Sequence, residues 1–319
     1  MNARVVVSAA YIAVAFAVLG FALLRGGGSP IMLVVAIAVC AVPLLLYLLM
    51  HAPRLFVALP GLVLGFMPFA AAPGTGAPLV VVLMALIIPV AALHPNRMPR
   101  PLGPLGVTVL AFLVISAVSM LANYNGFEAF WEYAKWAIAT GSALVALTMD
   151  DALRRTLMRA FAASAAAGAA VTAVMLNLDP QGKWVNSFSF LGYGGTQAVN
   201  SRTAVVGTQE VLRASGLYVD PNSAGLVFVM AAGVGGAVFL GVTRLVVLAA
   251  LATGVVATLS RSAVLTMIVA FLAFILIARL DAGRRLLFAA LGVVALTAVL
   301  FIPAVSSRLF DSFGGRDVG

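Results

Sequence analysis

Long apolar runs alternate with short polar segments along this chain of 319 residues. An apolar run of about 20 residues crosses the hydrocarbon core of a bilayer as a helix. Eleven runs bounded by charge, Gly or Pro are predicted to be spans: Val5–Leu24, Ile31–Met50, Leu55–Ala71, Leu79–Leu93, Leu105–Ala122, Ala129–Met149, Leu157–Leu176, Asn222–Val242, Leu245–Leu259, Ala263–Ala278 and Leu286–Pro303. The pattern predicts an all-α, polytopic integral membrane helical bundle, with residues 1–319 forming a single polytopic membrane domain.

Composition excludes a soluble globular protein. The chain is 63% hydrophobic and 9% charged, with a mean hydropathy of +1.14. Soluble domains are about 45–50% apolar and about 25% charged. The first run follows Arg4 and has no small-x-small cleavage site, which predicts an uncleaved span rather than a signal peptide.

The distribution of basic residues predicts a cytoplasmic N-terminus. With this orientation, eleven of the 19 Lys+Arg fall in short inside segments, among them "HPNRMPR", "DDALRRTLMR" and "RLDAGRR". Seven fall in outside segments of roughly twice the total length, and Lys135 lies within the sixth span. Short cytoplasmic loops carry an excess of Lys and Arg. The net charge of +9 therefore reports orientation and does not indicate nucleic acid as a partner.

The cysteine and histidine content predicts no metal and no cofactor. Cys40 is the single cysteine and lies in an apolar run, so no disulfide can form within the chain. His51 and His94 have no Cys, Asp or Glu near them in sequence, and both fall on the predicted cytoplasmic side as polar interface residues. The chain also has neither a Walker A loop nor a dinucleotide-binding fingerprint.

One predicted external loop is much longer than the others. It runs over residues 177–216, and loops of this length are usually functional or disordered. Within it, the stretch Val199–Leu212 is predicted to form a short surface helix. Four aromatic residues are interleaved among Gly, Ser and Asn in this loop: Trp184, Phe188, Phe190 and Tyr193.

The first candidate site is "RASGLYVDPNSAG", where the eighth span begins on the external side. Asp220 is a favourable N-cap, Pro221 suits the first helical position, and Asn222 adds a polar group to the first turn. The helix N-terminus and the nearby charge of Arg213 both favour an anion, although Asp220 partly cancels that field. The alternative is a well-capped helix preceded by a loop arginine.

The second candidate is "LSRSA", the turn between the ninth and tenth spans. The chain allows about 54 Å of helix from Leu245 to Leu280, whereas two perpendicular crossings need about 60 Å. Ser260 and Arg261 are therefore predicted to lie near or below the outer membrane boundary, where an arginine is costly unless it snorkels or meets an anion. The alternative is that Arg261 anchors to ordinary lipid headgroups.

The third candidate is "NGFEAFWEYAKWA", at the external entry to the sixth span. Glu128, Glu132 and Lys135 share one helical face, with Trp131 and Trp136 at the level of the interface. This pattern predicts a charged patch that lines an external cavity. An aromatic belt with a snorkelling lysine explains it equally well.

Taken together, a long external loop ending in R-x-S-G, a "DPN" opening a span and an S-R pair about 40 residues later resemble the bacterial O-antigen ligase and polymerase family. The resemblance covers residues 213–278. It implies a GT-C-like, metal-independent membrane glycosyltransferase on the external face of the bacterial inner membrane. The implied partners are the bilayer, an undecaprenyl-pyrophosphate-linked glycan donor and a glycan or lipid A-core acceptor.

The resemblance also assigns roles to residues. Arg213 and Arg261 match arginines thought to grip the lipid pyrophosphate, and Ser260, Asn222 and Lys135 are the further substrate-binding candidates. Family members usually have a second large external loop with a histidine as general base, whereas this sequence stops where that loop starts, after residue 304. The expectation is a truncated chain whose general base lies beyond Gly319 and which is inactive alone.

Two alternatives to glycosyl transfer remain open. A multi-pass transporter or lipid-linked-glycan flippase would carry polar residues near the midplane of several spans and discontinuous helices in two halves. The predicted span centres are almost entirely Ala, Val, Leu, Gly and Ile, which favours an externally open site instead. A non-enzymatic membrane scaffold is the other alternative, and the Gly-, Ala- and Ser-rich helices suit all three.

Overall fold

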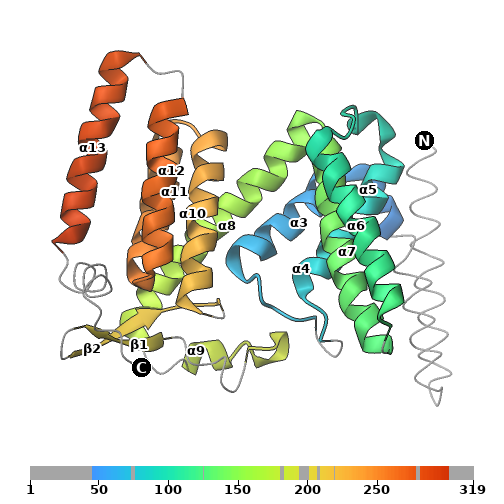
Figure 1. The fold of residues 1–319 in the computed structure, drawn as a ribbon, viewed down its shortest axis with the longest axis horizontal. Coiled ribbons are helices and arrows are strands. Elements are labelled where there is room, and N and C mark those ends of the chain that lie inside the picture. Colours follow the sequence, from blue (N-terminus) through green and yellow to red (C-terminus); the bar gives the residue numbers. More distant parts are fainter. Residues whose placement is uncertain are drawn as a thin grey trace, which may run out of the picture.

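Helices make up most of the protein (Figure 1). The computed structural model describes residues 45–72, 76–124, 126–179, 183–193, 201–206, 209–218, 220–277 and 281–301. A helix over Leu45–His51 precedes α3 (Pro53–Phe66), α4 (Leu79–Ala85), α5 (Ile87–Leu93), η1 (Pro95–Arg97), α6 (Pro104–Ala122), α7 (Phe127–Thr148), α8 (Asp151–Leu178), α9 (Lys183–Asn186) and η2 (Ser189–Leu191). Strands β1 (Ser201–Val206) and β2 (Gln209–Ala214) lead to α10 (Pro221–Val238), α11 (Gly241–Thr258), α12 (Arg261–Ile277) and α13 (Ala282–Leu300). This mostly helical bundle agrees with the predicted all-α class.

Four helices of the described chain are long and apolar enough to cross a membrane, namely α6, α8, α10 and α11. A fifth is added if the bent pair of Leu45–His51 and α3 is one span. Their length and apolar character support the predicted membrane class. The described residues therefore contain fewer candidate spans than the eleven predicted. The first predicted span and most of the second lie outside the described residues.

Predicted spans from the third to the eleventh coincide with helices, but the fourth is divided. The predicted span Leu79–Leu93 consists of α4 and α5, separated at Leu86. Pro89 explains the break, because its ring clashes with the carbonyl group four residues earlier and it has no N–H to donate. The run is thus helical as predicted, with a turn at Leu86, whose φ of −67° and ψ of −18° stay in the α-helical region.

A sharper break precedes α3. The helix Leu45–His51 and α3 meet at 99°, and Ala52 between them has a non-helical backbone with φ −126° and ψ 48°. Pro53 follows Ala52, and a residue before proline is disfavoured in the α-helical region. Leu45–His51, which is the described end of the second predicted span, and α3 consequently form one bent pair.

Small residues let α3 pack closely along α8. A Cβ added to Gly65 would lie 2.1 Å from Ser164 Oγ, and one added to Gly61 would lie 2.7 Å from the Leu157 carbonyl oxygen. The Ser164 hydroxyl donates to the Gly61 carbonyl at 3.2 Å. Close backbone approach is what small residues provide in membrane helix pairs.

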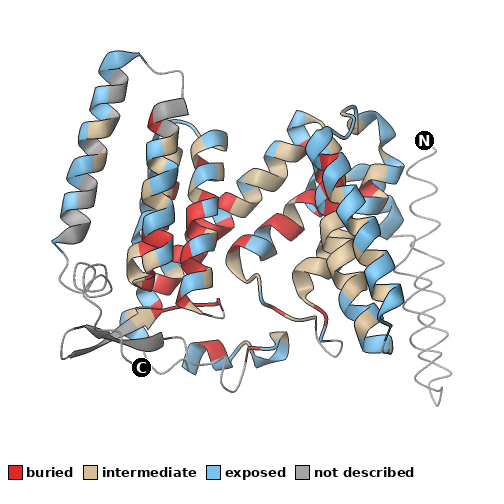
Figure 2. Cartoon of the chain, viewed as in Figure 1, coloured by how far each residue is buried: buried red, intermediate tan, exposed pale blue. Residues whose placement is uncertain are grey.

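The long helix α8 joins two helix groups, each with its own buried core (Figure 2). One group packs α10 and α11 against α8, and α12 against α10, around Ala169, Phe228 and Leu251. The other packs the Leu45–His51 helix, α3, α5 and α7 around Phe56 and Ile87. In Figure 1, α10–α12 lie on one side of α8 and α6–α7 on the other.

The predicted surface helix over Val199–Leu212 is wrong, because this stretch is an antiparallel hairpin of β1 and β2. Val206 pairs with Gln209, so the connection is the dipeptide Gly207-Thr208. β1 contains two Val and one Thr, which prefer β structure and were a signal in the sequence, whereas β2 contains one Val.

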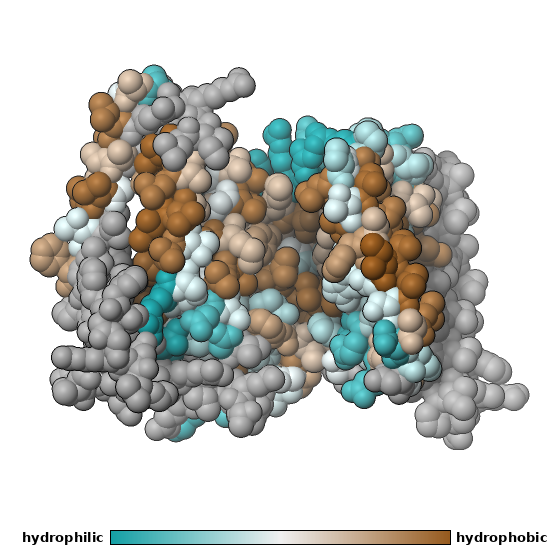
Figure 3. All heavy atoms as spheres, viewed as in Figure 1, coloured by the Kyte–Doolittle hydropathy of each residue, from teal (hydrophilic) through white to brown (hydrophobic). Residues whose placement is uncertain are grey.

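An apolar outer surface surrounds the helices. Large apolar side chains of α6 are widely exposed, namely Leu105, Val107, Leu110, Phe112, Val114, Ile115, Val118 and Leu121. Figure 3 shows apolar residues over the middle of both helix groups and hydrophilic residues toward the ends. A soluble monomer rarely exposes so large an apolar surface, which suits contact with lipid tails.

Candidate functional site

The first two sequence candidates lie against each other in the fold. A Cβ added to Gly225, in the first turns of α10, would lie 2.5 Å from Ala263 Cβ and 3.3 Å from Ser260 Cβ. The N-terminal ends of α10 and α12 are therefore side by side. Only a glycine permits this approach, and the "SAG" of the first motif supplies it.

The N-terminus of α10 is capped at the residue that the sequence indicates. The Asp220 carboxylate accepts from the backbone N–H of Asn222 at 2.8 Å and of Ser223 at 3.1 Å. The Ser223 hydroxyl donates to the other carboxylate oxygen at 2.5 Å. Pro221 is the first helical residue, so its missing N–H leaves no donor unpaired.

Arg213 bridges the two helix ends. It lies near the end of β2, is half-buried, and donates through Nε to the Thr258 carbonyl oxygen at 3.1 Å. Its Nη2 donates to Asn222 Oδ1 at 2.8 Å. The guanidinium is thus oriented by the last residue of α11 and the first turn of α10.

The "LSRSA" turn has a specific backbone geometry. Leu259 adopts a left-handed conformation with φ 49° and ends α11. A non-glycine residue there costs roughly 1–2 kcal/mol, so packing must hold the turn in place. The buried Ser260 hydroxyl accepts from the Ala263 N–H at 3.3 Å and lies 3.1 Å from Ser262 Oγ. Arg261, half-buried, is consequently the first residue of α12.

The segment between β2 and α10 turns inward, a feature the sequence pattern did not indicate. Ser215, Leu217 and Tyr218 are all buried, and Gly216 has φ +56°. A Cβ on Gly216 would lie 2.1 Å from Thr172 Oγ1 of α8. The polar loop predicted here is therefore packed against the bundle directly after Arg213.

Tyr218 anchors this inward segment. Its hydroxyl donates to the Gly65 carbonyl of α3 at 2.5 Å, and its ring packs edge-on against Phe228 with centroids 5.0 Å apart. Burial raises the pKa of the Tyr218 hydroxyl, so this group remains a protonated donor at physiological pH. The sequence offered one signal for it, an aromatic residue between the R-x-S-G and "DPN" motifs.

Other loop residues support the anchor. The Tyr193 hydroxyl donates to the Leu217 carbonyl at 3.0 Å, and burial also raises the pKa of Tyr193. The Asp179 carboxylate accepts from the backbone N–H groups of Lys183 and Trp184, both at 2.7 Å. The described part of the long loop is thus held on the bundle by hydrogen bonds, while residues 194–200 lie outside the description.

Lys135 belongs to a different part of the molecule. Its helix α7 packs on α6 and α4, and its ammonium group pairs with Glu132 at 2.5 Å. Trp136 of the same helix packs edge-on against Phe112 of α6. The third sequence candidate therefore stands apart from the arrangement around Arg213.

The hairpin brings two arginine positions into register, which the sequence analysis did not predict. Arg202 of β1 pairs with Arg213 of β2 in the backbone ladder.

The arrangement is suited chemically to binding an anion. Two capped helix N-termini meet at one end of the bundle, and Arg213 and Arg261 lie beside them. Helix N-termini and guanidinium groups both favour phosphate oxygens. Among the described residues, no cluster of three His, Cys, Asp or Glu forms a metal site.

Comparisons of the chain with protein-family models, curated proteins and solved structures give no match.

Proposed function

We propose that this protein is a membrane glycosyltransferase of the O-antigen ligase or polymerase type. Its donor would be an undecaprenyl-pyrophosphate-linked glycan, used on the external face of the bacterial inner membrane. The observation that carries the proposal is the meeting of two distant motifs, in which Arg213 hydrogen-bonds both Thr258 and Asn222. The motifs that produced the resemblance thus form one cationic arrangement.

Arg213 and Arg261 would bind the pyrophosphate of the donor. When an acceptor hydroxyl attacks the anomeric carbon, the bond from that carbon to the pyrophosphate oxygen breaks and the electron pair stays on the pyrophosphate. Fixed guanidinium donors stabilise this developing charge more than the ground state. The base that takes the acceptor proton is unassigned within residues 1–319, and the resemblance expects a histidine in the second external loop.

Asn222 and Ser260 have positioning roles in this proposal. Asn222 Oδ1 accepts from Arg213, and buried Ser260 caps the helix that begins with Arg261. Asn222 therefore orients the Arg213 side chain, and Ser260 stabilises the helix start at which Arg261 lies. Lys135 is further away on α7 and would contribute only to a separate charged patch with Glu132.

The predicted orientation is part of the same proposal. In Figure 1 the α7–α8 and α10–α11 connections lie at one end of the bundle and the hairpin at the other. The first end includes Arg97, Arg100 and Arg154, in segments predicted to be cytoplasmic. By the positive-inside rule, this arrangement supports an external location for the hairpin and the α10–α12 site.

Replacement of the two arginines tests the proposed function. In the full-length protein expressed in its source cell, Arg213→Ala and Arg261→Ala are each expected to deplete the surface glycan ladder on a gel. Arg100→Ala is the matched control, because Arg100 pairs with Asp151 at the opposite end. Unchanged ladders in both site variants, at normal protein level, would refute the site assignment.

A transporter or flippase is the second candidate, and one observation favours it. The 99° break before α3 and the break between α4 and α5 are discontinuous helices of the kind that form transporter sites. Both breaks lie in the same helix group, whereas inverted repeats would distribute them over two halves. Lipid-linked-glycan scrambling by proteoliposomes, without glycan transfer, would establish this function and overturn the first.

A further inference from the structure

Two arginines meet at the C-terminal end of α10, opposite the candidate site. The last carbonyl groups of an α-helix lack partners within the helix. Arg159 of α8 donates through Nε to the Val238 carbonyl oxygen at 3.3 Å. Arg244 of α11 donates through Nε to the Phe239 carbonyl oxygen at 3.0 Å. The two side chains thus converge on consecutive residues of the α10–α11 turn.

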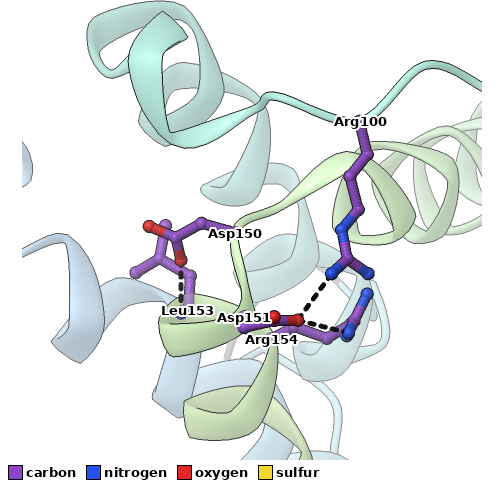
Figure 4. A network of polar contacts seen from close by, with 5 residues as sticks. All are labelled: Arg100, Asp150, Asp151, Leu153 and Arg154. Carbon is purple, nitrogen blue, oxygen red and sulfur yellow. Dashed lines mark hydrogen bonds and ion pairs between the residues drawn. The ribbon is translucent and has the colours of Figure 1, made fainter.

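These arginines differ in charge balance from their neighbours. Figure 4 shows Arg100 and Arg154 both directed at Asp151, at 2.7 and 2.5 Å. No carboxylate pairs with Arg159 or Arg244 within the described residues. Each guanidinium uses only its Nε in a hydrogen bond there, so the N–H groups at its terminal nitrogens remain available to a ligand.

The geometry concentrates positive charge. The two guanidinium groups contact the carbonyl groups of consecutive residues, whose α-carbons lie about 3.8 Å apart. The negative end of the α10 dipole offsets only part of their charge. A phosphate oxygen near both groups would receive charge-assisted hydrogen bonds from two fixed donors.

The surroundings select the kind of anion. Four apolar side chains of the same turn are strongly exposed: Leu240 at 74%, Val242 at 76%, Leu245 at 67% and Val246 at 62%. Free phosphate has no apolar part that could contact these side chains. A lipid carries its phosphate next to acyl chains, which matches a cationic pair beside exposed apolar residues.

We propose that Arg159 and Arg244 bind the phosphate of an anionic phospholipid headgroup, with its acyl chains along the exposed residues of the α10–α11 turn. The bound lipid would fix α8, α10 and α11 relative to one another, because the two arginines belong to α8 and α11 and both hold α10. This site is independent of the proposed glycan transfer, which concerns the other end of α10.

Lipid titration of the purified full chain in neutral detergent tests the proposal. Phosphatidylglycerol should raise the thermal unfolding midpoint, and phosphatidylcholine at the same concentration should raise it much less. In Arg159→Gln/Arg244→Gln, apparent phosphatidylglycerol affinity should fall about tenfold or more. Arg100→Gln is the control and should respond as the unaltered chain does.

Three results would overturn the proposal. The first is a double variant that binds phosphatidylglycerol as tightly as the unaltered chain. The second is equal stabilisation by both lipids. The third is that inorganic phosphate alone reproduces the shift, which would indicate an anion site without lipid. If the Gln variant does not fold, the variant Arg159→Lys/Arg244→Lys replaces it, because lysine retains the positive charge but lacks the planar guanidinium group. Unchanged phosphatidylglycerol affinity in this variant would contradict binding by the two guanidinium groups.

Discussion

Removal of one hydroxyl group tests how the loop that carries Arg213 is anchored. Tyr218→Phe keeps the ring that packs edge-on against Phe228 and deletes only the donor to the Gly65 carbonyl. Gly65 is the penultimate residue of α3, so no later N–H of that helix reaches its carbonyl. The variant therefore leaves a C-terminal carbonyl without the partner that the tyrosine supplied.

The size of the effect follows from burial. Tyr218 is 2% exposed, so water does not replace the lost donor at this position. Leaving a buried acceptor unsatisfied costs about 1–3 kcal/mol of unfolding free energy. The weakened anchor should also increase proteolytic cleavage in the hairpin, because Tyr218 follows β2 by only a few residues.

Tyr133→Phe is the matched control. Its hydroxyl donates at 3.1 Å to the Leu113 carbonyl, which lies inside α6 and keeps its helical hydrogen bond. This control should cost about 0.5–1.5 kcal/mol or less, as an ordinary hydrogen bond does. Unfolding in detergent, followed by denaturant titration and by limited proteolysis, measures both variants. Equal losses in Tyr218→Phe and Tyr133→Phe would refute the argument that α3 depends on this tyrosine.

Three further predictions concern the same region. Gly225→Ala should reduce glycan transfer and lower the unfolding midpoint, because its Cβ would lie 2.5 Å from Ala263 Cβ. Gly233→Ala in the same helix is the control, because its Cβ would meet nothing within 4 Å. It should leave glycan transfer unchanged and should change stability little or raise it by up to about 1 kcal/mol. Asp220→Asn should keep the helix cap while removing a negative charge, so binding of a soluble pyrophosphate probe, measured by calorimetry, should tighten; Asp220→Ala should instead destabilise α10 by about 0.5–2 kcal/mol. Burial raises the pKa of the Tyr218 hydroxyl, so its stabilising contribution is complete below the unfolded pKa of about 10 and is lost as pH rises above that value. The unfolding midpoint of Tyr218→Phe should therefore decline less steeply above about pH 10 than that of the unaltered chain. Parallel declines would contradict this.

Hydropathy predicted the helices well and their continuity poorly. Predicted boundaries for α6 and α7 differ from the observed ones by at most two residues at either end. The turn at Leu86 was missed because a window of apolar residues looks the same whether or not its backbone is interrupted. The break at Ala52 falls between two predicted spans, Ile31–Met50 and Leu55–Ala71, but its angle of 99° was not predicted. Pro89 and Pro53 contained the information, since proline removes a helical donor and restricts its neighbour.

The hairpin shows a different limit. Val199–Leu212 is short and mixed, and a surface helix and a two-stranded ribbon were both compatible with its length. Strand preference depends on pairing and packing more than on intrinsic backbone tendency. The partner strand therefore decided its structure, and with it the pairing of Arg202 with Arg213.

By itself, the sequence determined the membrane class, the approximate limits of most helices and the cap at Asp220, because these depend on local apolar length and on hydrogen bonds within a single turn. Only the tertiary structure decided that Arg213 and the Ser260 turn form one arrangement and that Lys135 stands apart. It also decided that Arg159 and Arg244 meet at the other end of α10. These relations join residues 45 or more positions apart, or depend on where a glycine lets two helices touch, and no local pattern specifies such contacts.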